Sequence, residues 1–210
     1  MPLTLFGSRG SGSAAIEMAL RAAQLEYRVV RAAEWEADSA MDELLAINPL
    51  GQIPTLVLAD GTVLSESAAI LIYLGLEYPG HALLPETASE RAQALRGLVY
   101  IAANCYSAVS ISDYPERWTS SKTKAAHERV RAAARAQLHR HWDIFFQQFT
   151  PELERTKANP GALAFLAVVV SRWSGTRKHL QANGSKVPRL LAALEQHPRL
   201  ASVLREHGAA

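Results

Sequence analysis

The first 78 residues alternate short strand-like and helix-like segments, and this order restricts the fold more than any other feature of the chain. Strands are indicated over residues 3–6, 27–31, 55–58 and 62–64, and helices over residues 14–24, 39–47 and 65–77. The helical segments place apolar residues at helical spacing, whereas the strands alternate or are rich in β-branched residues. Asp60-Gly61 separates the last two strands and indicates a hairpin. The order β-α-β-α-β-β-α predicts a thioredoxin-like α/β domain, in which helices flank a mixed sheet.

The pattern changes after Tyr78. Residues 79–88 contain turn-forming Pro and Gly and are expected to form a linker, and beyond Ser89 no strand pattern appears. Helices are predicted over residues 91–112, 122–149, 161–173, 187–195 and 198–206, the second of them ended by Pro151. We therefore expect two domains: a thioredoxin-like domain over residues 1–78 and an all-α C-terminal domain over residues 89–210.

Composition excludes several classes of protein. The net charge of +2 and the scattered Lys and Arg do not favour nucleic-acid binding. The longest apolar run, residues 162–170, is too short to span a membrane, and no secretory signal precedes the first strand. The single Cys105 excludes an intrachain disulfide, and the seven His residues show no metal-ligand spacing. A cytoplasmic protein without a metal site is expected.

Two short motifs are the candidates for a binding site. In the segment Asn48-Pro-Leu-Gly-Gln-Ile-Pro-Thr-Leu56, Pro54 stands at the entry of a strand, where Pro is tolerated. If the Ile53–Pro54 bond is cis, the backbone groups of Ile53 face outward and can pair with an extended peptide. The second motif, Glu66-Ser67, begins a helix. Its residues either cap that helix or bind a ligand that carries both a carboxylate and an ammonium.

The segment Gly7-Ser-Arg-Gly-Ser-Gly-Ser13 connects the first strand to the first helix. Glycine-rich loops at such junctions often bind phosphate. However, neither the nucleotide-binding pattern Gly-x-x-x-x-Gly-Lys-Ser/Thr nor Gly-x-Gly-x-x-Gly is present. The loop alone therefore does not identify a ligand.

Taken together, Asn48-Pro-x-Gly-x-Ile-Pro-x-Leu56 and Glu66-Ser67 resemble the glutathione-binding half of the cytosolic glutathione transferases, of bacterial type. Residues 104–106, 113–118, 171–173 and 197–200 resemble the family as well. The resemblance implies that Ile53, Pro54, Glu66 and Ser67 hold glutathione. Gln52, beside the Ile53 backbone, is expected either to bind the glycyl carboxylate or the peptide, or to serve only as a turn residue. The resemblance further implies that a hydroxyl near the first helix stabilises the glutathione thiolate. By placement Ser11 is the expected catalytic residue, with Ser8 and Ser13 as its rivals.

The function implied by this resemblance is glutathione transfer: the thiolate of glutathione, as co-substrate, attacks an apolar electrophile. A homodimer is also implied. Tyr106 is expected either to contact substrate, including a partner subunit's glutathione, or simply to pack where the two domains meet. A non-catalytic glutathione-binding or structural relative would share every binding motif. A glutathione-dependent isomerase is less favoured, because the Ser-Ser-Cys loop associated with maleylacetoacetate isomerases is absent.

One departure from the family concerns folding. The helix over residues 161–173 usually opens with a Ser/Thr-x-x-Asp capping box, but this chain has Gly161 and Ala164 at those positions. Asn159, followed by Pro160, is the expected replacement cap.

Overall fold

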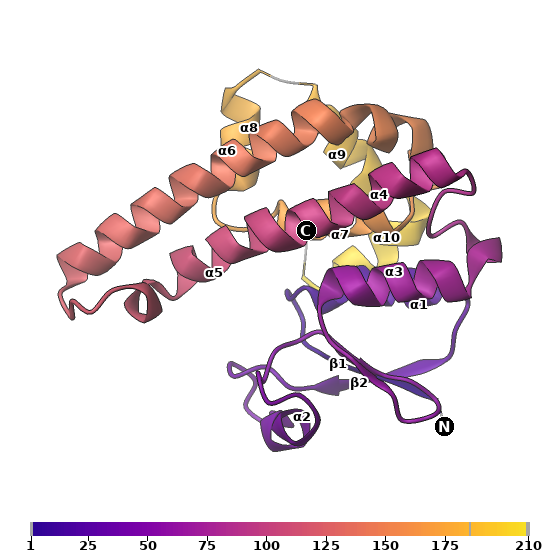
Figure 1. Ribbon diagram of the computed structural model, residues 1–210, viewed down its shortest axis with the longest axis horizontal. Helices are drawn as coiled ribbons and strands as arrows, with labels where there is room; N and C mark the ends of the chain where they lie inside the picture. The colour runs from indigo at the N-terminus through magenta and orange to yellow at the C-terminus, as the bar shows by residue number, and fades with distance from the viewer. Residues whose placement is uncertain (1, 185, 209–210) are drawn as a thin grey trace.

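The computed structural model describes residues 2–184 and 186–208. Four strands form one sheet in the order β2-β1-β3-β4 (Figure 1). They are β1 (Leu3–Gly7), β2 (Tyr27–Arg31), β3 (Thr55–Val57) and β4 (Val63–Leu64). The first strand pairs in parallel with β2 and antiparallel with β3, which in turn pairs antiparallel with β4. The predicted thioredoxin-like arrangement of a mixed sheet flanked by helices is confirmed.

Three helices accompany this sheet: α1 (Ser13–Ala22), α2 (Met41–Ile47) and α3 (Ser67–Glu77). Figure 1 shows α1 and α3 between the sheet and the later helices, with α2 on the opposite side of the sheet. Every residue from 13 to 20 is buried. This complete burial follows from the position of α1, which packs on the sheet with one face and on α7 and α10 with the other.

Beyond α3 the described residues form only helices and their connections. These are η1 (Pro79–His81), α4 (Ala88–Tyr100), η2 (Ile101–Tyr106), α5 (Ser107–Asp113), η3 (Pro115–Trp118), α6 (Lys124–Thr156), α7 (Ala162–Val170), α8 (Thr176–Ala182), α9 (Val187–Gln196) and α10 (Pro198–Glu206). The long predicted helices are present, and the structure contains one further helix, α8, that the sequence did not indicate. One continuous cluster of buried apolar side chains extends from β1 through α1 and α3 into these helices. The domain boundaries given above stay a prediction.

The predicted helix over residues 91–112 is present but is not uniform. Residues Ile101–Tyr106 adopt a π-helix between the α-helical segments α4 and α5. A π-helical turn inserts extra residues into the helix and thereby changes which side chains face a given direction; such turns are frequent at functional sites. The apolar residues of the sequence keep their spacing through the π-helical segment. The sequence therefore did not indicate that the helical geometry changes there.

The prediction that Pro151 ends its helix was wrong. Helix α6 continues through Pro151 to Thr156. Pro lacks the N–H that the helix would use, and this normally breaks or kinks a helix. Here the turn that follows is anchored by Leu153, which is fully buried, and by Arg155, which lies 3.1 Å from Glu90 of α4. Tertiary packing after the proline therefore outweighs the local preference for a break.

The continuous helix of residues 88–113 is also long enough and apolar enough to cross a membrane, with a mean hydropathy of 1.2 over its best window. The expectation above concerned uninterrupted apolar runs, whereas this helix also contains polar and charged residues. Within the fold this helix packs against α6 and α7. Core helices pass the same test of length and composition, so one such helix is weak support for a membrane span.

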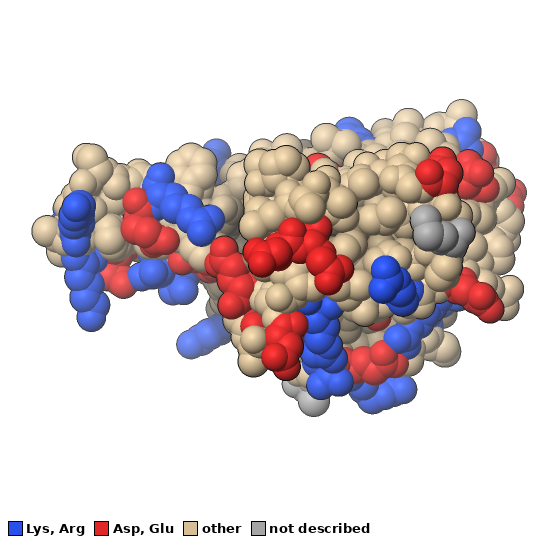
Figure 2. Space-filling view, turned by 90° about the horizontal axis from the view of Figure 1, so that it is seen from below, with Lys and Arg blue, Asp and Glu red and all other residues tan. Residues whose placement is uncertain are grey.

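Charged side chains of both signs are interspersed on the face of the molecule seen in Figure 2. Acidic groups gather near the middle of this face, and both basic and further acidic groups lie toward its edges. A nucleic-acid-binding face would instead gather basic side chains. This face therefore has no basic patch of that kind.

Candidate functional site

Side-chain hydrogen bonds fix the turn before β3, and the backbone groups of Ile53 in this turn are left unpaired. The Asn48 side-chain amide donates to the carbonyl of Gln52 at 3.2 Å and to the Thr55 hydroxyl at 2.9 Å, and the same hydroxyl donates to the Gln52 carbonyl at 2.8 Å. The Ile53–Pro54 peptide is cis, as expected. Among the described residues, neither the N–H nor the C=O of Ile53 has a hydrogen-bond partner. Both groups are thus available to an extended ligand.

The start of α3 is not capped by its own side chains. Glu66 occupies the N-cap position with φ 66° and ψ 112°, and no side chain accepts a hydrogen bond there. The first intrahelical bond at this end runs from the Ile70 N–H to the Glu66 carbonyl at 3.0 Å. The N–H groups of residues 67–69 have no partner within the part of the chain that the structure describes. Simple capping therefore does not explain Glu66-Ser67, whereas free N–H groups at a helix start attract an anion.

The serines of the loop before α1 bind one another. The Ser11 hydroxyl donates to the Ser8 carbonyl at 2.7 Å and accepts from the Ser13 N–H at 3.2 Å. The Ser13 hydroxyl bonds to the same carbonyl at 3.2 Å, and the Ser8 hydroxyl donates to Glu36. All three serines are buried. This network holds the loop in shape and occupies the hydroxyl of Ser11, whose catalytic role stays a prediction.

Tyr106 joins the two halves of the chain at this loop. Its hydroxyl lies 3.4 Å from the Ser67 hydroxyl. It also lies so close to Gly12 that a side-chain carbon on Gly12 would overlap it, and that carbon would stand 3.5 Å from the ring of Pro54. The Tyr106 ring meets Trp173 edge-on, with 5.6 Å between the ring centroids. Burial raises the pKa of Tyr106 to about 12, so the phenol is neutral at physiological pH.

The structure therefore brings Pro54, Ser67 and Tyr106 together around Gly12, the residue that precedes α1. Ile53 and Glu66 adjoin this point through their neighbours in sequence, whereas the Gln52 side chain is exposed and without a hydrogen bond among the described residues. Two participants were missed by the sequence analysis: Gly12, where backbone and phenol approach closely, and Glu36, which holds Ser8. Glycine at a crowded helix start was the one available signal.

A small cavity of about 240 Å³ adjoins the loop. Gly10 and Ser11 line it on one side, and Arg172, Trp173 and His207 line it on the other. The Gly10 N–H donates to His207 Nδ1 at 3.2 Å, and His207 Nε2 lies 2.8 Å from Glu17. These bonds tie the end of α10 to the loop and so fix the width of the cavity.

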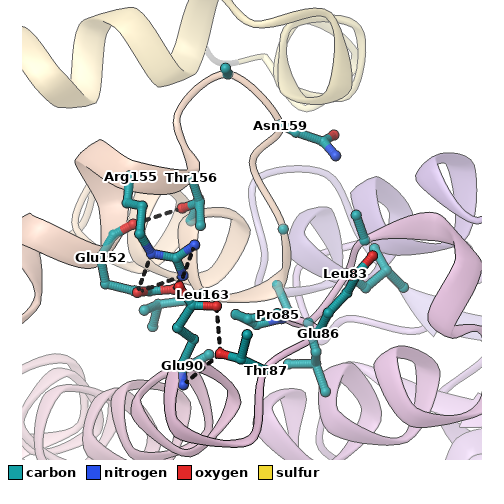
Figure 3. Close-up of a pocket in the computed structure, with 17 residues that line it drawn as sticks. Leu83, Pro85, Glu86, Thr87, Glu90, Glu152, Arg155, Thr156, Asn159 and Leu163 are labelled. Carbon is teal, nitrogen blue, oxygen red and sulfur yellow. Dashed lines mark hydrogen bonds and ion pairs between the residues drawn. The ribbon is translucent and has the colours of Figure 1, made fainter.

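A separate cavity of about 350 Å³ lies where the 82–87 linker meets the ends of α4, α6 and α7 (Figure 3). In Figure 3 the Arg155 guanidinium turns back onto Glu152, with contacts down to 2.7 Å, and it also lies 3.1 Å from Glu90. Its charge is thus already balanced by two carboxylates. None of the residues predicted to bind glutathione lines this cavity.

Cys105 is fully buried in η2, and burial raises the pKa of its thiol to about 12. Since the thiolate is the reactive form, we expect thiol reagents at neutral pH to leave the folded protein unlabelled and to label it rapidly in denaturant. Mass spectrometry of the alkylated protein gives the labelling rates of the folded and of the denatured protein. Labelling of the native protein at the rate of a free cysteine would contradict this prediction.

Comparisons with known proteins bear on the family and the fold. The family model "Glutathione S-transferase, N-terminal domain" matches residues 1–75. The uncharacterized GST-like protein YncG of Escherichia coli K12 is 28% identical over 207 residues, with 98% of each chain covered. A probable maleylacetoacetate isomerase of Vibrio cholerae is 30% identical over 161 residues, which are 74% of this chain and 71% of that protein.

Among solved structures, a glutathione transferase homolog from Sulfitobacter, crystallised with bound glutathione, superposes with a TM-score of 0.81 at 24% identity. The match covers 100% of this chain and 99% of that one. The fold, the family model, the relatives in sequence and the convergence of the predicted motifs around one helix start all lead to the same conclusion: this chain belongs to the glutathione S-transferase family.

Proposed function

We propose that this protein is a glutathione transferase, which conjugates the thiol of glutathione to an electrophilic small molecule. The observation that carries the proposal is a pair of unsatisfied backbone sites, at Ile53 and at the start of α3, whose neighbours Pro54 and Tyr106 both lie close to Gly12. One site suits an extended peptide and the other suits its carboxylate. Glutathione has both features.

The two sites would divide the tripeptide between them. The α-carboxylate of the γ-glutamyl residue would accept from the free N–H groups of residues 67–69 and from the Ser67 hydroxyl, and its ammonium would face Glu66. The cysteinyl residue would pair with the N–H and C=O of Ile53 as an added strand does. Gln52, which is exposed beside that backbone, would then contact the glycyl end. In this arrangement the cysteine side chain lies over Pro54 and faces Gly12.

The same position favours the thiolate. The thiol has an ordinary pKa near 8.5, so only a few per cent is ionised at neutral pH. The N–H of Gly12 has no partner among the described residues, and it lies at the positive end of α1. An anion held there is stabilised, which lowers the pKa of the thiol. The thiol proton leaves to solvent, the sulfur forms the bond to the electrophilic carbon, and any leaving group departs with its electron pair.

The electrophile would enter the cavity beside the loop. Trp173 lines this cavity and packs against Tyr106, so the cavity lies next to the proposed position of the sulfur. A volume of about 240 Å³ suits a small molecule or part of one.

A homodimer is proposed as well. Residues 98–109 are rich in apolar side chains, but part of this stretch is buried within the chain, since Leu98, Ile101 and Cys105 are fully buried. Val99 and Trp118 remain 54% and 57% exposed. Light scattering at micromolar concentration tests the assembly.

Two alternatives compete with the transferase. A non-catalytic glutathione-binding protein would retain the same backbone sites. A glutathione-dependent isomerase is favoured by one observation, the 30% identity to a probable maleylacetoacetate isomerase of Vibrio cholerae. An isomerase returns glutathione unchanged, whereas a transferase consumes it.

The test is a calorimetric titration with glutathione, followed by incubation with an aryl halide and assay of free thiol. We expect saturable binding, stoichiometric loss of thiol and the thioether in the mass spectrum. Binding without consumption of thiol from any of a panel of electrophiles would favour the alternatives. Absence of binding would refute the proposal.

A further inference from the structure

The hydroxyl protons of the loop before α1 are already used. Ser8 donates to Glu36, and Ser11 and Ser13 both bond to the carbonyl of Ser8, at 2.7 and 3.2 Å. A serine hydroxyl has a single proton to donate. For Ser11 to donate to a ligand it would have to give up its 2.7 Å bond to the Ser8 carbonyl, within a network whose three serines are all buried.

The Tyr106 hydroxyl is in the opposite situation. Its one hydrogen-bond partner among the described residues is the Ser67 hydroxyl, at the long distance of 3.4 Å. Ser67 likewise has no other hydrogen bond from its side chain in that part of the chain. A ligand atom that enters between Gly12 and Pro54 would therefore meet a phenol whose one hydrogen bond is long and weak.

The backbone directs this phenol to the site. Tyr106 is the last residue of the π-helical segment, so the change of helical geometry ends at the residue that reaches across to α1 and α3. Trp173 meets the ring edge-on and limits its movement. The absence of a side chain at Gly12 leaves the space in which the hydroxyl lies.

We infer that Tyr106, from the helical half of the chain, is the catalytic residue that donates a hydrogen bond to the glutathione sulfur, in place of a serine of the loop. This inference rests on the proposed function, because it requires glutathione in the site described above. It assigns the loop serines a structural role, and it makes thiol activation depend on how the helical half packs against the sheet.

The chemistry of the two candidate donors favours this assignment. A phenol is far more acidic than an aliphatic hydroxyl, so it forms the stronger hydrogen bond to an anion. Burial keeps the pKa of Tyr106 high, so at neutral pH the phenol retains its proton and acts as a donor. Donation to the sulfur stabilises the thiolate and not the thiol, so the pKa of the bound thiol falls. The proton of Tyr106 stays on its oxygen throughout.

The experiment measures the ultraviolet absorbance of the thiolate of bound glutathione against pH, in the wild type, Tyr106→Phe, Gly12→Ala and Ser11→Ala. Removal of one hydrogen bond to an anion is expected to raise the pKa of the bound thiol by about one in Tyr106→Phe. Gly12→Ala should raise it similarly, because the new methyl group displaces the phenol without removing it. The conjugation rate then falls about tenfold at low pH and recovers at high pH, where the thiol is ionised in both proteins.

Tyr114→Phe is the matched control. Tyr114 lies just after α5, and its ring stacks with Arg117 at 4.1 Å, away from the site. The inference is overturned if Tyr106→Phe leaves the pKa of the bound thiol at the wild-type value, or if Ser11→Ala alone raises it. A wild type that does not bind glutathione, or that binds it without lowering the pKa of its thiol, would refute the transferase itself. The two failures are therefore distinguished by the wild-type curve.

Discussion

Replacement of Glu66 by Ala is expected to weaken glutathione binding about tenfold, because the γ-glutamyl ammonium loses a charged hydrogen-bond partner. Glu66 precedes α3 and is exposed, so solvent screens part of its attraction for the ammonium. The carboxylate of the same ligand group would still find the N–H groups of residues 67–69. Binding should therefore be reduced and not abolished. Calorimetric titration with glutathione at low salt gives the ratio of dissociation constants.

The control for this variant is Glu77→Ala. Glu77 is the last residue of the same helix and is also exposed, so its removal changes the net charge equally. It lies at the far end of α3, about 15 Å from the start of an 11-residue helix. Equal weakening in both variants would show a general charge effect and contradict the assigned role of Glu66.

The backbone at Glu66 provides a second variant. Its φ of 66° lies in the left-handed region, which is unfavourable for every residue except Gly. Such outliers persist where the surroundings fix them and are frequent at ligand sites. Glu66→Gly removes the same carboxylate as Glu66→Ala but relieves this strain. We expect Glu66→Gly to have a higher melting temperature than Glu66→Ala but to bind glutathione equally weakly. The two measurements thereby separate the role of the side chain from that of the backbone.

The two binding motifs could be found from the sequence because each is local. Ile53 and Pro54 would act through their own backbone, and Glu66 and Ser67 would act through the start of the helix that they begin. The periodicities on either side place both motifs correctly. By contrast, the contact of Tyr106 with Gly12 and Ser67 joins residues that are far apart along the chain. No local pattern encodes such a contact, and the π-helical turn that directs Tyr106 leaves the apolar spacing unchanged.

The loop serines show what a local pattern leaves out. Three hydroxyls near a helix start indicate donors for a ligand, but their availability depends on what else accepts their protons. Ser8 is held by Glu36, 28 residues later, in a segment to which the sequence assigned no role. The donors of the loop are thus occupied by a network that becomes visible only once β1, β2 and the segment after β2 are folded together.

The start of α7 is a further case in which a long-range contact replaces a local one. The capping box typical of the family is missing, and Asn159, the expected substitute, makes no cap: the N-cap position is Gly161, without a side-chain hydrogen bond. Instead the N–H of Ala162 donates to the carbonyl of Leu83 at 2.9 Å. The linker before α4 therefore caps a helix that begins about 80 residues later, and the two segments lie side by side at the cavity of Figure 3.

This contact gives the largest stability effect that we expect from adding a single methyl group. In Gly161→Ala the new carbon would stand 2.5 Å from the carbonyl oxygen of Leu83 and 2.9 Å from that of Ala82. Both are backbone atoms, so no side-chain rotation relieves the overlap, and the linker must move away from α7. The loss combines overpacking with a broken hydrogen bond, about 3 kcal/mol in all. The melting temperature should fall by roughly 6–12 °C.

Gly80→Ala tests the explanation, since Gly80 lies in the same linker and a side-chain carbon there would meet no other atom within 4 Å. We expect this variant to melt within about 2 °C of the wild type, as surface substitutions usually do. Equal melting of Gly161→Ala and Gly80→Ala would mean that the linker yields without cost and does not cap α7. Gly161→Ala can have a lowered melting temperature and still bind glutathione at low temperature. In that case the contact stabilises the packing of the linker on α7, and the glutathione site forms independently of that contact.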